Sequence, residues 1–458
     1  MTSRKNDFTQ GKMSTNILKM AAPMTLALLI NVLYSIVDRI YIGHMAGTGT
    51  FALAGIGLAF PIIAVISAFQ SLFSTGGSPL CSIARGEGDD DKAELIMGNC
   101  YAMLVVTGII LTAVCLIFKA PVLRLVGADD STFDYANDYL TIYICGTVFV
   151  MTGLGMNAFI NAQGFATTGM LTVLVGAVIN IALDPLFIFA FNMGVQGAAL
   201  ATIIAQCCSA VWVFIFLTGK RAILKLRLKN LVIRPRIIGR VCALGLSGFT
   251  MAVTNSAVGM VNNAMLHELG GSIYISIMTV INSMREMLLM PMMGLNSGTQ
   301  PVLSYNYGAK SYRRVREGIR LMTTYVVVYS VFVWIVILLI PGVFIRIFNS
   351  DPELIEKGLP CIRIYFAMVF FMAFQIAGQN VFTSLGKAKQ AIFFSLLRKA
   401  ILVIPLIILL PRMFGLGVMG VFAAEPVSDV LGGSACFLTM YFTVWRRLPK
   451  GDRLPAQS

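Results

Sequence analysis

Apolar stretches recur along the whole chain, and short polar segments separate them. Each stretch has about 20 residues, enough to cross the ~30 Å hydrocarbon layer of a bilayer as an α-helix. The pattern therefore predicts an all-α polytopic membrane protein with no soluble domain. We expect twelve transmembrane helices, at residues 16–43, 51–75, 95–118, 139–161, 169–191, 196–217, 238–265, 273–297, 320–342, 361–383, 391–411 and 417–444.

The few charged residues indicate which way these spans point. The chain is 57% hydrophobic and 12% charged, whereas about a quarter of residues are charged in soluble domains. Cytoplasmic loops are enriched in Lys and Arg, and the connection between spans six and seven is the most basic one. It has no acid, and it contains Lys220, Arg221, Lys225, Arg227, Lys229, Arg234, Arg236 and Arg240.

This basic connection is therefore predicted to be cytoplasmic, and alternation along twelve spans places both termini on the same side. Most other loop lysines and arginines also fall on that side. The net charge of +14 is then a signal of topology, and we expect no nucleic-acid partner. The first 15 residues lack the order of a cleaved signal peptide, so the first span is expected to stay as an anchor.

The chain also contains two copies of one unit. A shift of 222 residues aligns Pro79 with Pro301 and Gly164 with Gly386, and nearby shifts align Asp38 with Asn262. Six spans per copy give both copies the same orientation, so two six-helix bundles related by a pseudo-two-fold axis along the membrane normal are expected. The predicted parts are an N-terminal tail at 1–15, bundles at 16–219 and 238–445, a basic linker at 220–237 and a C-terminal tail at 446–458.

Acidic residues inside the spans are the candidate functional groups. An Asp at the centre of a membrane helix costs roughly 2.5 to 3.5 kcal/mol, yet Asp184 lies in the apolar segment NIALDPLFIF. Asn180 is on the same helical face, four residues earlier. Asp38 in span one and Thr202 in span six lie at a similar depth. These oxygen ligands suit Na⁺, and a carboxyl pair equally suits H⁺.

Two simpler interpretations stand beside this one. Asp38 could pair with the adjacent Arg39, and Asn180 could only satisfy the backbone carbonyl that Pro185 leaves free. In the second copy, Glu425 and Asp429 form another acidic pair, while Arg285 and Glu286 are adjacent charges in span eight. Those four residues either line a second cavity or pair with one another between spans. Cysteine and histidine patterns predict no metal site apart from the possible Na⁺ site.

The residues as a whole resemble the MATE family of multidrug and toxic compound extrusion antiporters, and most of all its bacterial MepA-like type. The resemblance covers residues 14 to 445 and depends on Pro23 and Asp38 of span one, NIALDP of span five and GAALAT of span six. It implies an outward-open V of two bundles, with the coupling ion at Asp38, Asn180, Asp184 and Thr202.

The resemblance also implies a hinge at Pro23 and an N-terminal cavity lined by Asn31, Tyr34 and Asn157. We expect motion at Pro185 and further substrate contacts from Met287, Gln379 and Glu425, since methionine and sparse acids suit lipophilic cations. One branch of the family has Na⁺-binding acids on spans seven and ten. This chain has Asn262, Asn263, Gln375 and Gln379 there, so we expect no second Na⁺ site.

No ATP-binding P-loop is present, so we expect exchange of organic cations for Na⁺ or H⁺ without any other cofactor. The protein is expected as a monomer in the bacterial cytoplasmic membrane. One alternative is a lipid-linked oligosaccharide flippase of the same superfamily, which would need a strongly cationic cavity. The other is an intramembrane lipid-modifying enzyme. The loop acids Asp89, Asp90 and Asp91 come closest to the metal-binding motif of such an enzyme, but the favoured interpretation of these acids is a run of solvated charges.

Overall fold

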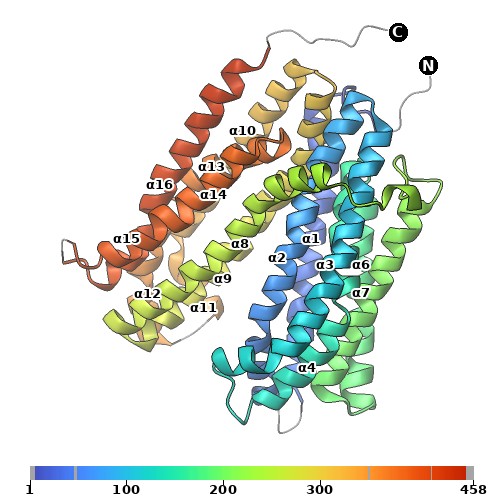
Figure 1. Cartoon of the computed structure of the whole chain (residues 1–458). Helices are drawn as coiled ribbons and strands as arrows, with labels where there is room; N and C mark the ends of the chain where they lie inside the picture. Colours follow the sequence, from blue (N-terminus) through green and yellow to red (C-terminus); the bar gives the residue numbers. More distant parts are fainter. Residues whose placement is uncertain (1–5, 46–48, 349–350, 414, 450–458) are drawn as a thin grey trace. The chain divides into compact units, whose positions relative to one another are not determined.

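The computed structural model describes residues 6–45, 49–348, 351–413 and 415–449, and the regular elements among them are all helical (Figure 1). Short π-helical turns are η1 (Leu186–Ala190) and η3 (Leu397–Val403), and 3-10 turns are η2 (Leu228–Asn230) and η4 (Trp445–Arg447). The α-helices are α1 (Met13–Gly43), α2 (Gly49–Glu87), α3 (Asp90–Leu125), α4 (Phe133–Cys145), α5 (Thr147–Ala162), α6 (Ala166–Pro185), α7 (Gly194–Thr218), α8 (Pro235–Gly270), α9 (Ser272–Gly308), α10 (Tyr312–Leu339), α11 (Pro341–Phe348), α12 (Pro352–Tyr365), α13 (Phe370–Ser384), α14 (Ala388–Leu396), α15 (Ile404–Leu409) and α16 (Val418–Thr443).

Among the described residues, ten helices are long and apolar enough to cross a membrane, and two bent helix pairs raise this number to as many as twelve. Each predicted span corresponds to one of these helices or bent pairs. The all-helical prediction is therefore confirmed. Several helices, such as α2 and α9, run well past the predicted apolar stretch, because helical hydrogen bonding continues beyond the hydrophobic segment.

Four predicted spans differ from straight helices. The span at 139–161 is the pair α4 and α5, bent by 59°, and the span at 361–383 is the pair α12 and α13, bent by 48°. The spans at 169–191 and 391–411 each contain a π-helical turn, η1 and η3. Hydrophobic periodicity predicts that a helix exists, but it does not locate such local breaks.

The contacts divide the chain into two compact units, which are described separately. The first unit comprises residues 1–7 and 22–245, and the second comprises residues 8–21 and 246–458. The division passes through α1 between Ala21 and Ala22 and through α8 between Gly245 and Leu246. The sequence-based bundle boundaries, at 219 and 238, remain a prediction.

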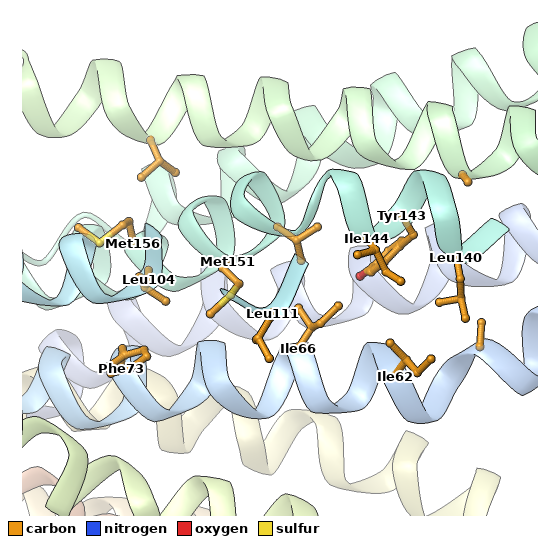
Figure 2. Close-up of a cluster of buried hydrophobic side chains, with 14 of the residues drawn as sticks. Ile62, Ile66, Phe73, Leu104, Leu111, Leu140, Tyr143, Ile144, Met151 and Met156 are labelled. Atoms are coloured by element: carbon orange, nitrogen blue, oxygen red, sulfur yellow. The ribbon is translucent and has the colours of Figure 1, made fainter. Parts of the chain in front are cut away.

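The core of the first unit is built from apolar side chains on α2, α3, α4 and α5 (Figure 2). Figure 2 shows Ile66 of α2, Leu111 of α3 and Met151 of α5 directed into one common layer. Their helices approach closely where residues are small. A Cβ on Gly76 of α2 would lie 2.1 Å from the carbonyl oxygen of Val241 in α8, so only glycine fits there.

The basic linker between the repeats is fastened to the first unit rather than left as a free loop. The buried Gln163 side chain accepts hydrogen bonds from the backbone amides of Ile223 and Leu224, at 2.9 and 2.8 Å. Asn99 accepts from the Arg234 amide at 2.7 Å. These bonds satisfy linker backbone groups that have no regular structure to pair with.

The second unit has two apolar cores. One is formed mainly by α8, α9, α12, α15 and α16, and the other by α9, α10, α13, α14 and α16. The segment that leads into α1 also belongs to this unit. The side chains of Asn306 and Arg314 both donate to the backbone carbonyl of Phe8, each at 3.1 Å.

Candidate functional site

Asp184 is fully buried near the end of α6 in the first unit. Its Oδ1 atom accepts a hydrogen bond from the Asn180 amide at 3.2 Å. The same amide donates to the hydroxyl of Thr202 on α7 at 3.4 Å. The structure therefore joins Asn180, Asp184 and Thr202 in one polar cluster, and the i, i+4 spacing in NIALDP supplies its first contact.

Asp38 of α1 faces this cluster, and its carboxyl group is a direct hydrogen-bonding neighbour of the Asp184 carboxyl group. The Asp38 Oδ1 and Asp184 Oδ2 atoms accept no hydrogen bond from any described residue. Arg39 forms no ion pair with Asp38 within the described part of the chain. Its guanidinium lies instead over the Phe60 ring, 5.0 Å from the ring centre. Two carboxyl groups thus meet without an ion pair to any described residue, and Arg39 acts on Asp38 only through space.

Two tyrosines complete the surroundings of the acid pair. Tyr34, one turn before Asp38 on α1, lies close enough to interact electrostatically with both acids. The buried Tyr139 of α4 is a hydrogen-bonding neighbour of Thr202. The cluster therefore draws side chains from α1, α4, α6 and α7. Any ion bound there would connect four helices.

A narrow cavity of about 20 Å³ adjoins the cluster within the first unit. Its lining includes Asn31 and Tyr34 of α1 together with Asn180 and Thr202. The third residue expected in this lining, Asn157, lies outside it and donates to the Gly169 carbonyl at 3.1 Å. Such a small space is on the scale of one water molecule rather than of a drug.

Of the two expected hinge residues, Pro185 lies beside a π-helical turn and Pro23 lies beside the division between the units. Pro185 is the last residue of α6, and the π-helical turn η1 follows it directly. Pro23 lies inside α1, which continues through it as a helix, two residues after the division between the units. Proline removes one backbone hydrogen bond of a helix, so the backbone hydrogen bonding of α1 and α6 is weakened at these two positions.

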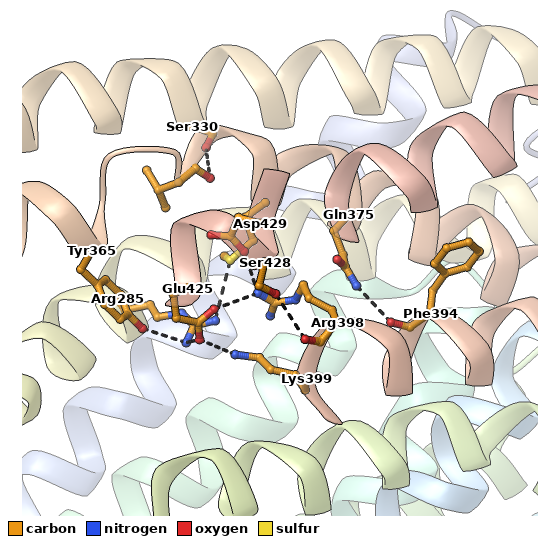
Figure 3. Close-up of polar contacts among 12 residues, drawn as sticks. Arg285, Ser330, Tyr365, Gln375, Phe394, Arg398, Lys399, Glu425, Ser428 and Asp429 are labelled. Carbon is orange, nitrogen blue, oxygen red and sulfur yellow. Dashed lines mark hydrogen bonds and ion pairs between the residues drawn. The ribbon is translucent and has the colours of Figure 1, made fainter. Parts of the chain in front are cut away.

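A second polar cluster lies in the second unit (Figure 3). Glu425 of α16 accepts hydrogen bonds from three basic side chains: Arg285 at 3.0 Å, Lys399 at 2.6 Å and Arg398 at 3.3 Å. Asp429 accepts from Arg398 at 2.7 Å. Except for Arg285, which is 19% exposed, these side chains are at most 5% exposed. We call these five residues the charged network.

The charged network borders a cavity of about 520 Å³ that is lined only by residues of the second unit. Gln379 and Glu425 line it, as predicted for substrate contacts, whereas Met287 is 66% exposed and lies outside the lining. Of the two interpretations of Arg285, Glu286, Glu425 and Asp429, the structure supports both in part. Arg285 and Glu425 form an ion pair with each other, and both line the cavity. Glu286 lines the cavity and forms no ion pair with any described residue. Asp429 forms an ion pair with Arg398 and lies outside the cavity lining.

The sequence analysis missed Arg398 and Lys399, which lie in the π-helical turn η3 of span eleven. The available signal was the pair of basic residues inside the apolar stretch FFSLLRKAILVIPL. Buried cations of this kind need anionic partners, and the acids of span twelve were the nearest candidates in the sequence.

Comparisons with known proteins agree with one another. The sequence profile of the family described as MatE matches residues 23–186 and again residues 247–409. The second match lies in the second half, as the internal repeat predicts. The multidrug export protein MepA of Staphylococcus haemolyticus (strain JCSC1435) is 24% identical over 411 residues, which cover 89% of each chain.

Solved structures share the fold over nearly the whole length. An outward-facing multidrug resistance MATE family transporter of the MOP superfamily superposes with a TM-score of 0.88 and 19% identity, covering 97% of this chain and 99% of that one. A MOP superfamily transporter from Pyrococcus furiosus, for which a reversed polarity of the binding pocket is described, gives a TM-score of 0.90 with the same identity and coverage.

Proposed function

This chain belongs to the MatE family of membrane transporters, and on that premise we propose that it is a secondary active multidrug efflux antiporter. It would export lipophilic organic cations in exchange for Na⁺ or H⁺. The staphylococcal relatives that cover about nine-tenths of the chain are named multidrug export proteins. Because the family consists of transporters, the lipid-modifying enzyme is set aside.

The observation that carries this proposal is the carboxyl pair of Asp38 and Asp184. Two carboxyl groups in contact, one of them fully buried, form no ion pair with a described residue, and the adjacent Arg39 acts on Asp38 only through space. A buried carboxylate without a counter-ion is unfavourable by several kcal/mol, so the pair favours an incoming cation or proton. Asn180 and Thr202 add two neutral oxygens, and oxygen donors are the ligands that Na⁺ and other hard cations prefer.

The mechanism follows from where these groups are anchored. The acids lie on α1 and α6, and the hydroxyl of Thr202 lies on α7. Cation entry would neutralise the pair, draw these helices together and change the packing that holds a drug. Pro23 and Pro185 would absorb the resulting change in helix geometry. Because linkage is reciprocal, a drug that favours the ion-free state must weaken ion binding, which gives exchange.

The substrate contacts are proposed at Asn31, Tyr34 and Asn157 in the first unit and at Met287, Gln379 and Glu425 in the second. Asn31 and Tyr34 line the same small cavity as Asn180 and Thr202, so these two side chains would contact the substrate and also lie beside the bound ion. We place the protein in the bacterial cytoplasmic membrane as a monomer with both termini in the cytoplasm. The basic linker and C-terminal tail support that orientation through the positive-inside rule.

The proposal is tested with purified protein in proteoliposomes that contain a fluorescent organic cation such as ethidium. We expect dye movement under an imposed Na⁺ gradient or pH gradient, but not in the absence of both. Dye movement that ignores both gradients would contradict antiport. Movement of a lipid-linked pyrophosphate without any dye movement would favour the flippase.

A further inference from the structure

A groove at the end of the first unit where α6 begins and α7 finishes has no role in the transport chemistry described above. Its volume is about 590 Å³, within the range of about 300 to 1,000 Å³ that ligand pockets occupy. All of its lining residues fall between Phe165 and Arg221, so the groove belongs to the first unit alone. The lining divides into an apolar part and a basic end, and this division indicates the occupant.

The apolar part of the groove is open to the outside of the unit. Trp212 and Ile215 of α7 are 39% and 63% exposed, and Leu171 of α6 is 36% exposed. The Phe165 and Phe216 rings also line the groove, and they pack edge to face with their centres 5.2 Å apart. Both helices are long and apolar enough to cross a membrane, so these exposed apolar side chains form a surface for acyl chains.

The basic end consists of Lys220 and Arg221, which lie just past the end of α7. Both side chains are exposed, and neither forms an ion pair or a hydrogen bond with a described residue. No acid lines the groove among the described residues, and the sequence from 219 to 240 contains none. The potential at this end of the groove is therefore positive, which favours an anionic group.

The backbone that carries the two cations is fastened to the unit. The Ile223 amide donates to the side chain of Gln163 at 2.9 Å, and the Lys225 amide donates to the carboxylate of Glu94 at 2.9 Å. The two basic residues lie between these bonds and the end of α7. Because their backbone is already ordered, binding of an anion there loses less conformational entropy than binding to a free loop.

The first turn of α6 adds to the same preference. The N-terminus of a helix carries partial positive charge, and the N-cap residue Phe165 gives this end no side-chain hydrogen bond. Thr168, in that first turn, also lines the groove. Its hydroxyl group can donate to a phosphate oxygen.

The spacing along α7 matches the layers of a membrane surface. Trp212 lies about two helical turns, or roughly 12 Å, before Lys220, and tryptophan is enriched where the hydrocarbon layer meets the headgroups. The positive-inside rule assigns the basic linker to the cytoplasm. Anionic lipids of the cytoplasmic leaflet attract basic segments, and basic pockets between transmembrane helices bind anionic headgroups.

We propose that this groove binds a phospholipid with an anionic headgroup, such as phosphatidylglycerol. Its phosphate contacts Lys220 and Arg221, and one acyl chain lies along Trp212 and Ile215. The site does not depend on the proposed export function, since none of its lining residues belongs to the ion or substrate contacts proposed above.

The test uses Trp212 as the reporter. The chain has three tryptophans, and the double substitution Trp334→Phe/Trp445→Phe leaves Trp212 alone. This protein is reconstituted in phosphatidylcholine vesicles that contain either brominated phosphatidylglycerol or brominated phosphatidylcholine, because bromine quenches tryptophan fluorescence only at close contact. We expect half-maximal quenching of Trp212 at a roughly tenfold lower mole fraction of the brominated phosphatidylglycerol, from the attraction of two cations.

Variants in the same single-tryptophan protein then locate the headgroup. Lys220→Gln/Arg221→Gln should remove the preference for phosphatidylglycerol, whereas Lys220→Arg/Arg221→Lys should keep it. Lys229→Gln/Arg236→Gln is the matched control, because it removes the same charge from exposed linker positions outside the groove lining. This control should keep the preference.

Equal quenching by the two brominated lipids would overturn the inference. A preference that survives in Lys220→Gln/Arg221→Gln, or one that is lost equally in the matched control, would also overturn it. Loss of the preference on addition of inorganic phosphate at constant ionic strength would assign the basic end to a free anion rather than to a lipid.

A second measurement needs no tryptophan substitution and applies if the single-tryptophan protein does not fold. Thermal unfolding of the detergent-solubilised wild type is compared with added phosphatidylglycerol and with added phosphatidylcholine. A ligand that binds the folded state raises the unfolding temperature, so we expect a larger rise with phosphatidylglycerol, and no difference between the lipids in Lys220→Gln/Arg221→Gln. Equal stabilisation of the wild type by both lipids would contradict the site.

Discussion

Replacement of Glu425 by glutamine tests how far the charged network, with three cations and two carboxylates, depends on this carboxylate. Both carboxylate oxygens accept hydrogen bonds, Oε1 from Arg285 and Lys399 and Oε2 from Arg398. Glutamine keeps the shape but turns one oxygen into an NH₂ group, which cannot accept. It also leaves three cations, of which Arg398 and Lys399 are buried, with the single carboxylate of Asp429.

The magnitude follows from the burial of these groups. Glu425 and Lys399 are 5% and 2% exposed, so solvent does little to screen the change. Removal of one partner from a buried ion pair destabilises a protein by about 3 to 5 kcal/mol. For a helical unit of this size we expect a fall in unfolding temperature on the order of 10 °C.

Lys399→Met provides the opposite perturbation in the same network. It leaves two cations, Arg285 and Arg398, with the carboxylates of Glu425 and Asp429, and so balances the charges. We therefore expect a much smaller loss of stability than in Glu425→Gln. The double variant Lys399→Met/Glu425→Gln should be more stable than Glu425→Gln alone, because one surplus cation has been removed.

The assay is thermal unfolding of the detergent-solubilised variants, followed by the fluorescence of a thiol-reactive dye on the buried cysteines. Lys357→Gln is the control, since its pair with Glu353 is exposed on α12 and should have no measurable effect. Strictly additive losses in the double variant, or a larger loss in Lys399→Met than in Glu425→Gln, would refute the charge-balance argument.

Two further predictions concern the first unit. Gly76→Ala should destabilise this unit by roughly 1 to 3 kcal/mol through overpacking, because the added Cβ would lie 2.1 Å from the Val241 carbonyl oxygen. Gly57→Ala, with open space around the Cβ, is the control and should be neutral in the same unfolding assay. Equal effects of the two substitutions would contradict the packing described for Gly76. Thr202→Val should raise the coupling-ion concentration for half-maximal dye efflux by roughly threefold to tenfold, since one hydrogen-bonded oxygen is lost. An unchanged midpoint would exclude Thr202 from the ion site, and Thr218→Val, at the end of α7, serves as its control.

The fold was largely predictable because hydrophobic length is a strong signal. Twelve apolar stretches correspond to helices or bent pairs, since a chain in lipid must satisfy its backbone hydrogen bonds internally. The bend at Gly146 between α4 and α5 had no such signal. It depends on tertiary packing, because a Cβ on Gly146 would meet the Ile203 side chain at 2.2 Å.

The polar cluster of Asp38, Asn180, Asp184 and Thr202 could be predicted from the sequence because its members follow local rules. Asn180 and Asp184 are one helical turn apart, and each polar residue stands out in an apolar span. The contact between Asp38 and Asp184 needed the matching depths of two spans, which alternation along the chain supplied. Asn157 was placed by family resemblance and Met287 by the suitability of methionine for lipophilic cations, and in the structure neither lines the cavity of its unit.

The charged network was only half predictable. Arg285, Glu425 and Asp429 were noticed as charges within spans, but Arg398 and Lys399 were not connected with them. Their side chains reach α16 from a π-helical turn. A π-turn rotates the following residues relative to an ideal α-helix, so positions counted at 3.6 residues per turn give the wrong face.

The central claim is that Asp184 couples ion entry to drug exit, and efflux by Asp184→Asn tests it most directly. The variant is reconstituted in proteoliposomes beside the wild type and Asp138→Asn, whose carboxylate lies on α4 and accepts a hydrogen bond from Gln196 at 2.9 Å. We expect gradient-driven ethidium efflux by the wild type and Asp138→Asn, and none by Asp184→Asn, at equal amounts of inserted protein. Wild-type efflux by Asp184→Asn would contradict the assignment of the ion site.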